Sequence, residues 1–212
     1  MSAPRKLSRE QLLERAAHLF AEHGYEDSTI STITAELGVT RPTLYTYTRS
    51  KQELVEAIYD QLFDFYQQAL PEFVRLDDAP LLRIQGLIKL QLEASVKLHD
   101  HLVLVLRRLD EIVERYPQIR EWWRSLDTLL LDAIKEAQDR GECSPLLDPS
   151  LLKHAIWAVI NDLPFWYRPG QLSGQQIADQ LILMFSAGFS AGKPEVQAGV
   201  DTQENPDEER VR

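Results

Sequence analysis

Long apolar runs are missing from this chain of 212 residues. No stretch approaches the roughly 20 apolar residues that a membrane-spanning helix needs, and no apolar segment follows the basic residues near the N-terminus, as it would in a secretory signal. Cysteine is almost absent: Cys143 stands alone, which excludes an internal disulfide. With 44% hydrophobic and 26% charged residues, the composition predicts an ordinary globular protein of the cytoplasm.

Motifs that carry catalysis or metal binding are also missing. The segment 188–193 has one residue too few between its glycines for a phosphate loop, and Pro194 stands where Ser or Thr is needed. His99 and His101 are two positions apart, and on a helix such side chains point about 200° apart, so they do not easily share one ion. No alternating strand pattern supports a dinucleotide site. The sequence therefore predicts no enzyme, no metal site and no cofactor.

Positive charge is scarce overall, because the net charge is −10. Its distribution is uneven, however. Residues 1–51 carry seven Lys or Arg against six Asp or Glu, a net charge of +1, whereas the remainder carries 16 against 27. Screening limits surface charge effects to about 8–10 Å. The asymmetry therefore permits a DNA-binding N-terminal region attached to an acidic body.

Helical periodicity is present almost throughout, which predicts an all-α fold. The first helix is expected from near Ser8 to Gly24, and the fourth begins at a Ser50-x-x-Glu53 capping box and runs to residue 70. We expect the other helices at 30–37, 41–47, 79–98, 101–115, 118–140, 149–167 and 173–191.

The pattern changes beyond residue 78, from short helices to longer ones, and this defines the expected domains. Residues 1–51 are expected to form a three-helix helix-turn-helix DNA-binding domain, which the helix at 51–70 connects to the rest. Residues 71–192 are expected to form an effector-binding and dimerisation domain. Residues 193–212 are polar and acidic, which predicts a disordered tail.

The segment 28–51 has the spacing of a helix-turn-helix. Thr29 and Thr40 are expected to cap the two short helices, and Gly38 permits the turn between them. Ile30, Ile33, Leu37, Val39 and Leu44 are expected to point inward. A short helix with exposed hydroxyl groups suits the major groove, and a cation in the first turn of the next helix suits a phosphate. The predicted DNA-binding residues are Thr29, Thr40, Arg41, Thr43, Tyr45, Thr46, Tyr47 and Lys51.

This ordered set of residues resembles the TetR family of regulators. The matching motifs are L-x-x-A-x-x-L-F-x-x-x-G-Y at 13–25, T-x-x-x-I-x-x-x-L-G-V at 29–39, T-L-Y-x-Y at 43–47 and S-K-x-x-L at 50–54. The resemblance implies that all the DNA-binding candidates except Thr46 lie at positions that contact DNA. Two positions depart from the family pattern. Thr34 replaces a customary Ala, and Thr48 replaces a customary Phe. The second change removes an apolar anchor, which predicts a somewhat different position of the recognition helix at 41–47.

Dimerisation is also implied by the resemblance, because most TetR-like proteins form homodimers through their last two long helices. Those helices are expected here at 149–167 and 173–191. A stripe on the last one suits the dimer seam, although a stripe of this kind also suits a core. The predicted interface residues are Ile177, Leu181, Met184, Phe185 and Gly188.

The effector is indicated by a second, shorter resemblance. The segment W-Y-R-P-G-x-L-S at 166–173, followed by I-A-D at 177–179, is similar to a TetR subgroup that controls steroid and fatty-acid catabolism, whose effectors include acyl-CoA thioesters. This implies a repressor that a hydrophobic or amphipathic effector releases from operator DNA. An aromatic or cationic drug-like effector, or a helical adaptor without DNA binding, are the alternatives. Pro164 is expected to kink its helix and open space beside the pocket. The predicted effector-binding residues are Arg107, Trp122, Trp123, Trp157, Asn161, Phe165 and Trp166.

Overall fold

Ten helices make up the computed structural model, which describes residues 7–167, 170 and 172–187. No strand occurs within these ranges, and the predicted all-α class is confirmed. The predicted acidic tail lies outside the described residues. The helices are α1 (Arg9–His23), α2 (Ile30–Leu37), α3 (Arg41–Leu44), α4 (Lys51–Phe73), α5 (Pro80–Lys97), α6 (His99–Arg107), α7 (Leu109–Arg115), α8 (Pro117–Asp139), α9 (Pro149–Trp166) and α10 (Gly174–Ala187).

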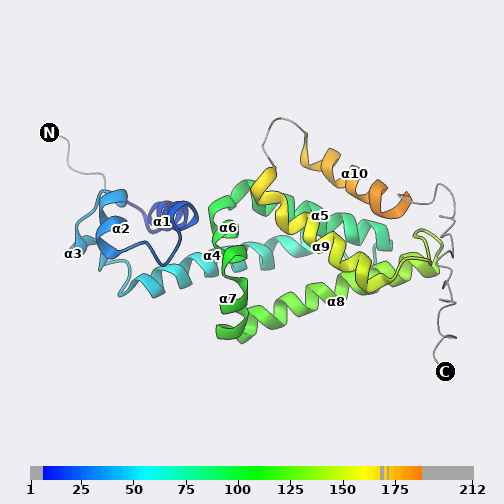
Figure 1. The fold of residues 1–212 in the computed structure, drawn as a ribbon, viewed down its shortest axis with the longest axis horizontal. Coiled ribbons are helices and arrows are strands. Elements are labelled where there is room, and N and C mark those ends of the chain that lie inside the picture. Colours follow the sequence, from blue (N-terminus) through cyan, green and yellow to red (C-terminus); the bar gives the residue numbers. More distant parts are fainter. Residues whose placement is uncertain (1–6, 168–169, 171, 188–212) are drawn as a thin grey trace, which may run out of the picture.

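The molecule is elongated, with a small head of α1 to α3 at one end (Figure 1). The long helix α4 begins in the head and extends into a body in which α5, α8, α9 and α10 pack together. Helices α6 and α7 lie between the two parts, and α6 packs directly against α1. The head therefore contacts the body through α6 as well as through α4.

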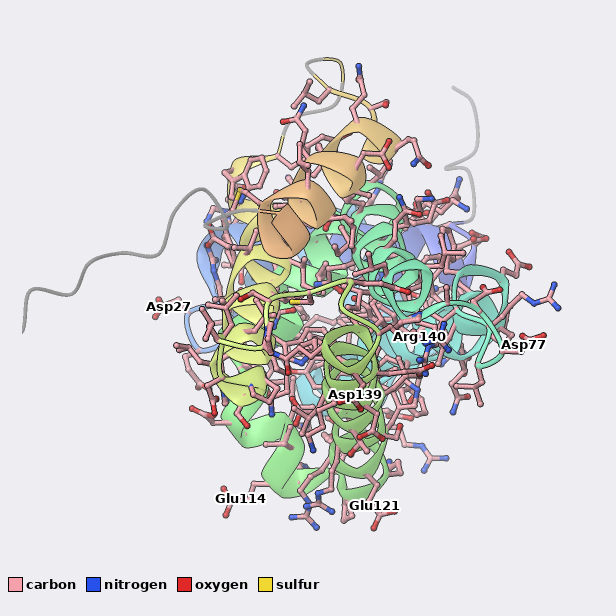
Figure 2. All side chains as sticks on the ribbon, turned by 90° about the vertical axis from the view of Figure 1, so that its right-hand side faces the viewer. Asp27, Asp77, Glu114, Glu121, Asp139 and Arg140 are labelled. Atoms are coloured by element: carbon pink, nitrogen blue, oxygen red, sulfur yellow. The ribbon has the colours of Figure 1, made fainter. Side chains whose placement is uncertain are left out.

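Acidic side chains project from several parts of the body. Figure 2 looks along the molecule from the body end and shows Asp77, Glu114 and Glu121 projecting from its outline, while Asp139 lies beside Arg140 near the middle of the view, at the end of α8. This placement agrees with the uneven charge of the sequence, in which the negative charge follows residue 51.

Local sequence explains where the short helices begin. Thr29 and Thr40 cap α2 and α3, because their hydroxyl oxygens accept hydrogen bonds from the backbone N–H groups three residues later. Ser50 caps α4 in the same way, through the N–H of Glu53 at 3.0 Å. The Glu53 carboxylate, however, accepts from the N–H of Arg49 and not from that of Ser50. The expected capping box at Ser50 is therefore formed on one side.

Two clusters of buried side chains form the core. The first runs from the head through α4 to α6 and α7, and it includes Phe20, Leu44 and Leu102, whose exposed fractions are 1% or less. The second fills the space between α5, α8, α9 and α10. The head therefore shares one continuous core with α6 and α7. Because protein interiors are close-packed, a displacement of α6 or α7 reaches the head.

Three helix boundaries differ from those expected. The predicted helix 101–115 is two helices, α6 and α7, separated at Arg108 (φ −125°, ψ 20°). Helix α4 continues through Pro71 to Phe73, because the proline lies in its last, exposed turn. Regular helix in the predicted segment 41–47 ends at Leu44, and residues 45–47 form turns.

Candidate DNA interface and effector cavity

Exposed hydroxyl groups cover the outer side of α2 and α3. Thr29, Thr40, Thr43 and Thr46 are all exposed. The Thr40 and Thr43 hydroxyls lie 2.9 Å apart, and the Thr46 hydroxyl donates to the carbonyl of Thr43 at 2.7 Å. Tyr45 is 51% exposed beside them. These residues form one polar face that includes the N-terminus of α3, and such a face suits phosphate oxygens and base edges.

Arg41 is the exposed cation of this face. Its Nη2 donates to the hydroxyl of Ser31 on α2 at 2.5 Å. Ser31 thus holds the arginine against the neighbouring helix, a contact that the sequence did not reveal. The guanidinium keeps further N–H donors for a guanine edge or a phosphate.

Tyr47 and Lys51 are turned partly inward. The Tyr47 hydroxyl donates to the carbonyl of Leu7 at 2.7 Å. The Lys51 ammonium donates to the carbonyl of Tyr25 at 2.7 Å and lies 3.9 Å from the centre of that ring. Both side chains therefore support the head internally, at positions that the sequence assigned to DNA contact.

The two threonines that depart from the family pattern are buried. The Thr48 hydroxyl donates to the carbonyl of Ser50 at 2.8 Å, and the Thr34 hydroxyl lies 3.0 Å from the carbonyls of Ile30 and Ser31. Each hydroxyl is therefore satisfied locally, and at Thr48 a hydrogen bond takes the place of an apolar anchor.

Tyr25, between α1 and α2, joins the head to the body. Its ring lies between the Lys51 ammonium and the guanidinium of Arg108, which is 3.8 Å from the ring centre. Its hydroxyl donates to the side chain of Gln52 at 3.0 Å. Gln52 in turn donates to the hydroxyl of Tyr116 at 3.3 Å. Side chains from both ends of α7, at Arg108 and Tyr116, therefore hold the base of the head.

Tyr116 is fixed at the far end of α7 by a second contact. Its hydroxyl donates to the Glu56 carboxylate at 2.8 Å. Burial and this hydrogen bond raise the pKa of Tyr116 to about 12. The phenol therefore remains a proton donor at neutral pH and links α7 to α4.

Helix α6 contacts α1 through its polar side chains. Arg107 donates from Nη1 to the carbonyl of Ala21, and the Nδ1 of His18 lies 3.0 Å from the Asp100 carboxylate. The structure thus places Arg107, a predicted effector residue, on the head and exposed. His101 is buried and pairs with Gln61 at 2.9 Å, and no group of three or more potential metal ligands occurs in the part of the chain that the structure describes.

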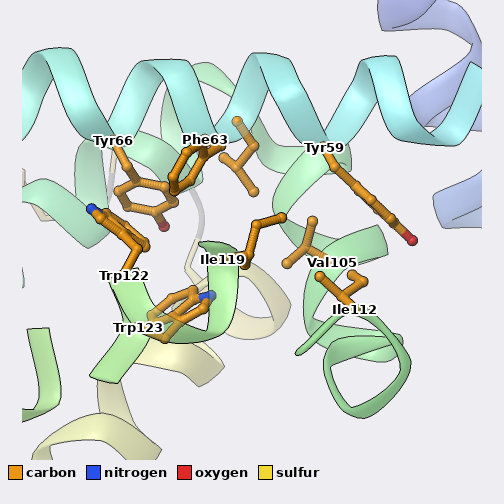
Figure 3. A pocket seen from close by; sticks show the side chains of 9 residues that line it. Tyr59, Phe63, Tyr66, Val105, Ile112, Ile119, Trp122 and Trp123 are labelled. Atoms are coloured by element: carbon orange, nitrogen blue, oxygen red, sulfur yellow. The ribbon is translucent and has the colours of Figure 1, made fainter. Parts of the chain in front are cut away.

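A small aromatic cavity, with a free volume of about 20 Å³, lies between α4, α6, α7 and α8. Figure 3 shows Phe63 and Tyr66 of α4 facing Trp122 and Trp123 of α8. The ring centres of Phe63 and Trp122 are 5.5 Å apart in an edge-to-face arrangement, and those of Tyr66 and Trp122 are 5.1 Å apart. The wall is made by Tyr59, Leu62, Phe63, Tyr66, Val105, Ile112, Ile119, Trp122 and Trp123.

The structure brings only two of the predicted effector residues, Trp122 and Trp123, to this cavity. Trp157 packs on Trp123 at 5.9 Å from outside the wall and donates to Asp127 at 3.1 Å, while Asn161 accepts from Gln91 at 3.3 Å. Phe165 and Trp166 are 42% and 48% exposed.

Helix α4 supplies most of the aromatic wall that sequence reasoning missed. Tyr59, Phe63 and Tyr66 recur at the i, i+4, i+7 spacing that places side chains on one helical face. That spacing was the available signal. Pro164, in contrast, lies inside α9, which continues to Trp166.

The predicted dimer residues fall on different sides of α10. Ile177 and Leu181 are 4% and 8% exposed and are buried within the protomer, where α10 packs on α5, whereas Met184 is 52% exposed. The side chain of Phe185 and all of Gly188 lie outside the described residues. An exposed row on α9, apolar apart from Asp162, was not anticipated: Leu151, Ala155, Ala158, Asp162 and Phe165.

Two family models match this chain. The model of bacterial regulatory proteins of the tetR family matches residues 12–58, and that of the tetracyclin repressor-like C-terminal domain matches residues 77–189. The second alone covers more than half of the chain. The chain therefore belongs to the TetR family of bacterial transcriptional regulators, whose members bind operator DNA and dimerise. Within the described residues, no helix is long and apolar enough to cross a membrane.

Individual relatives cover nearly the whole chain. The HTH-type transcriptional repressor KstR2 of Mycobacterium tuberculosis (strain ATCC 25618 / H37Rv) is 26% identical over 189 residues, which are 86% of this chain and 92% of the relative. The solved structure of the ketosteroid transcriptional regulator KstR2 of that species aligns with a TM-score of 0.72, 28% identity, and coverage of 85% and 93%. AibR in complex with isovaleryl coenzyme A and operator DNA has the same fold, with a TM-score of 0.70, 22% identity, and coverage of 84% and 97%.

Proposed function

We propose that this chain is a dimeric repressor that binds operator DNA through α2 and α3 and is released when a small apolar or amphipathic molecule enters the aromatic cavity. One observation carries the proposal. Ile112, in the middle of α7, lines the cavity, while Arg108 and Tyr116, at the two ends of α7, contact the base of the head.

DNA binding rests on the polar face of the head. Thr29 and Thr40 cap helices that present their N-termini outward, and Arg41 is exposed between them. Backbone N–H groups at helix N-termini, hydroxyls and arginine are the groups that position a protein on phosphates and read bases. In a dimer, the two recognition segments must lie roughly 34–36 Å apart to enter successive major grooves.

Release follows from the size of the cavity. Its free volume of about 20 Å³ is far below the range of about 300–1,000 Å³ that is usual for ligand pockets. An effector must therefore push α7 and α8 away from α4. That displacement moves Arg108 and Tyr116 and loosens their hold on Tyr25 and Gln52, so the separation of the two heads changes. Helix α4 transmits the same movement, because it carries both Tyr59 of the wall and Lys51 of the head.

An acyl-CoA thioester is the effector that we favour. KstR2 is named as a transcriptional repressor, and AibR has been solved with isovaleryl coenzyme A and operator DNA. The apolar wall suits an acyl chain, and its aromatic rings also suit an aromatic compound or a cation. Because the two classes differ in charge and shape, a direct titration separates them.

The test uses a fluorescent operator obtained by selection from random duplexes. Acyl-CoA thioesters are titrated against the complex, and anisotropy reports release. Linkage requires operator DNA to weaken effector binding by the same factor by which the effector weakens DNA binding. Thioester binding that is indifferent to operator would disprove the coupling, and release by aromatic or cationic compounds alone would disprove the thioester.

A variant with a filled cavity sharpens this test. Ile119→Phe adds a ring to the wall, so operator binding should remain while release by the effector is lost. Leu129→Phe is the matched control, because Leu129 is half-buried in the second core cluster, away from the cavity. If Ile119→Phe and Leu129→Phe respond to the effector alike, the aromatic cavity is not the effector site.

A further inference from the structure

Two buried hydrogen-bond donors without partners lie between the cavity and the head. Among the described residues, the buried side-chain atoms that lack a hydrogen-bond partner are Tyr59 Oη, Arg108 Nη1 and Arg83 Nε. Arg83 is on α5 and does not line this cavity. Tyr59 lines it, whereas Arg108 lies just outside the wall, one helical turn before the wall residue Ile112 and close enough for its charge to act on the Tyr59 hydroxyl. Buried polar atoms are normally paired, so two neighbouring ones beside the cavity indicate a ligand group.

Arg108 is held in a fixed orientation. Its Nε and Nη2 donate to the Glu111 carboxylate at 3.2 and 2.6 Å, and its guanidinium lies against the ring of Tyr25. The side chain is only 12% exposed. Because Nε and Nη2 are engaged with Glu111, the buried Nη1 is the group of the guanidinium that remains for another acceptor.

Tyr59 supplies the second donor. Its residue is 4% exposed, and its ring meets Tyr116 edge-on at 6.2 Å. In Figure 3 its ring closes one end of the cavity, and its hydroxyl points away from Trp122 and Trp123. Burial raises the pKa of Tyr59, and the nearby charge of Arg108 opposes that rise. The phenol therefore stays protonated and can donate a hydrogen bond.

We propose that the Tyr59 hydroxyl and Arg108 Nη1 form the polar end of the effector site and recognise an acceptor oxygen, either a carboxylate or a thioester carbonyl. The apolar tail of the same molecule lies toward Trp122 and Trp123. This inference rests on the proposed function. It specifies an amphipathic effector with an acceptor at one end, since both protein groups are donors.

The position of this polar end gives the effector a direct route to the head. Arg108 contacts Tyr25 and Glu111. An acceptor that binds Nη1 competes for the orientation of the same guanidinium and draws it away from Tyr25. Recognition of the effector's oxygen and release of the head are then one movement.

The experiment compares ligands of equal chain length. Octanoate has an acceptor, octylammonium has none, and octanoyl-CoA offers a thioester carbonyl in place of the carboxylate. Calorimetry should show that the wild-type protein prefers octanoate to octylammonium. Tyr59→Phe keeps the charge of the site but removes the hydroxyl, so octanoate affinity should fall about tenfold, the loss expected for one hydrogen bond to a charged group. If octanoyl-CoA shows the same dependence on Tyr59, the thioester carbonyl is recognised; if octanoate alone shows it, the carboxylate is.

Tyr66→Phe is the matched control. Tyr66 lines the same cavity, but its hydroxyl already donates to Gln91 at 2.6 Å. This variant should melt at a lower temperature and keep the wild-type ratio of octanoate to octylammonium affinity, whereas Tyr59→Phe should not melt lower, because its hydroxyl has no partner to lose.

The inference is overturned if Tyr59→Phe weakens octanoate and octylammonium alike, or if the wild-type protein does not distinguish them. The failure of the proposed function looks different: no ligand of any class would then release operator DNA. Release by both octanoate and octylammonium, with equal affinities, would keep the proposed function and reject the polar end.

Discussion

The head and the body of this regulator encode their functional residues over different distances along the chain. In the head, the caps at Thr29 and Thr40, the turn between them and the exposed Arg41 lie within a segment of 13 residues. In the body, the cavity wall extends from Tyr59 to Trp123 and takes side chains from four helices. The head can therefore be recognised from its own sequence, whereas the sensor exists only once α4, α6, α7 and α8 have packed.

The two parts therefore respond to substitution in different ways. A substitution in the head acts on DNA directly, at one half-site. A substitution in the body changes DNA binding indirectly. It alters the separation of the two heads in the dimer, and α4 and α7 transmit this change.

The largest effect is expected from the dimer. Ala158 lies in the exposed, mostly apolar row of α9, and Ala158→Glu places a second negative charge there, one turn from Asp162. We expect a monomer whose head is intact but whose operator affinity is lower by about 10²–10⁴-fold, because the two half-sites are no longer engaged together. Sedimentation velocity measures the assembly, and anisotropy measures the affinity.

Two control variants give this result its meaning. Arg124→Glu changes an exposed position of α8 and should remain a dimer. Leu181→Glu, although Leu181 belongs to the stripe predicted as the seam, places a charge at a side chain that is 8% exposed within the protomer. It should reduce folding itself. A dimeric Ala158→Glu would show that the row on α9 is not the interface.

The predicted dimer interface on α10 illustrates a limit of helical periodicity: it identifies an apolar face but not the surface that covers that face. The pattern correctly indicates that Ile177 and Leu181 need apolar contacts, but it does not say which surface provides them. Here α5 of the same chain does. The break between α6 and α7 was missed for a similar reason. Arg108 is neither Gly nor Pro, and its contacts with Tyr25, more than 80 residues earlier, are tertiary.

Helix identities and caps, in contrast, could be predicted because their causes are local. Ser50, Thr40 and Thr29 each satisfy N–H groups three residues away. Local sequence also led to Arg107 as the residue expected to meet an anionic group of the effector. In the structure Arg107 faces α1, and its neighbour Arg108 is the residue turned inward. A one-residue shift on a helix turns a side chain by about 100°, so only packing decides between them.

The second prediction tests the junction between head and body. Burial lowers the pKa of His101 to about 4 from its ordinary 6.5, although Asp100 acts in the opposite direction. Between these values the unfolded chain binds a proton that the folded chain excludes. The free energy of unfolding should therefore decrease as pH falls from about 6.5 to about 4, by about 3 kcal/mol at most.

Urea unfolding across this pH range measures the effect. His101→Gln removes the titrating group, and its unfolding free energy should lose less over the same range than that of the wild-type protein. His154→Gln, at an exposed position of α9, should follow the wild type. Equal pH dependence in all three proteins would show that His101 is not buried neutral at the junction.

The smallest effects, and the sharpest division within the head, concern Arg41 and Lys51. Arg41→Ala removes an exposed guanidinium that Ser31 orients, so we expect discrimination to relax at one or two base pairs per half-site, at a cost of about 1–3 kcal/mol there. Equal losses on operator and random duplex would instead make Arg41 a phosphate contact.

The Lys51 ammonium donates to the Tyr25 carbonyl. Because an ammonium has three N–H donors, Lys51 can also bind a phosphate. Lys51→Ala should then weaken binding to every duplex and lower the log–log salt slope by about one per half-site. An unchanged slope together with a lower free energy of unfolding would assign Lys51 to holding Tyr25 alone, and would leave direct contact with DNA to α2 and α3.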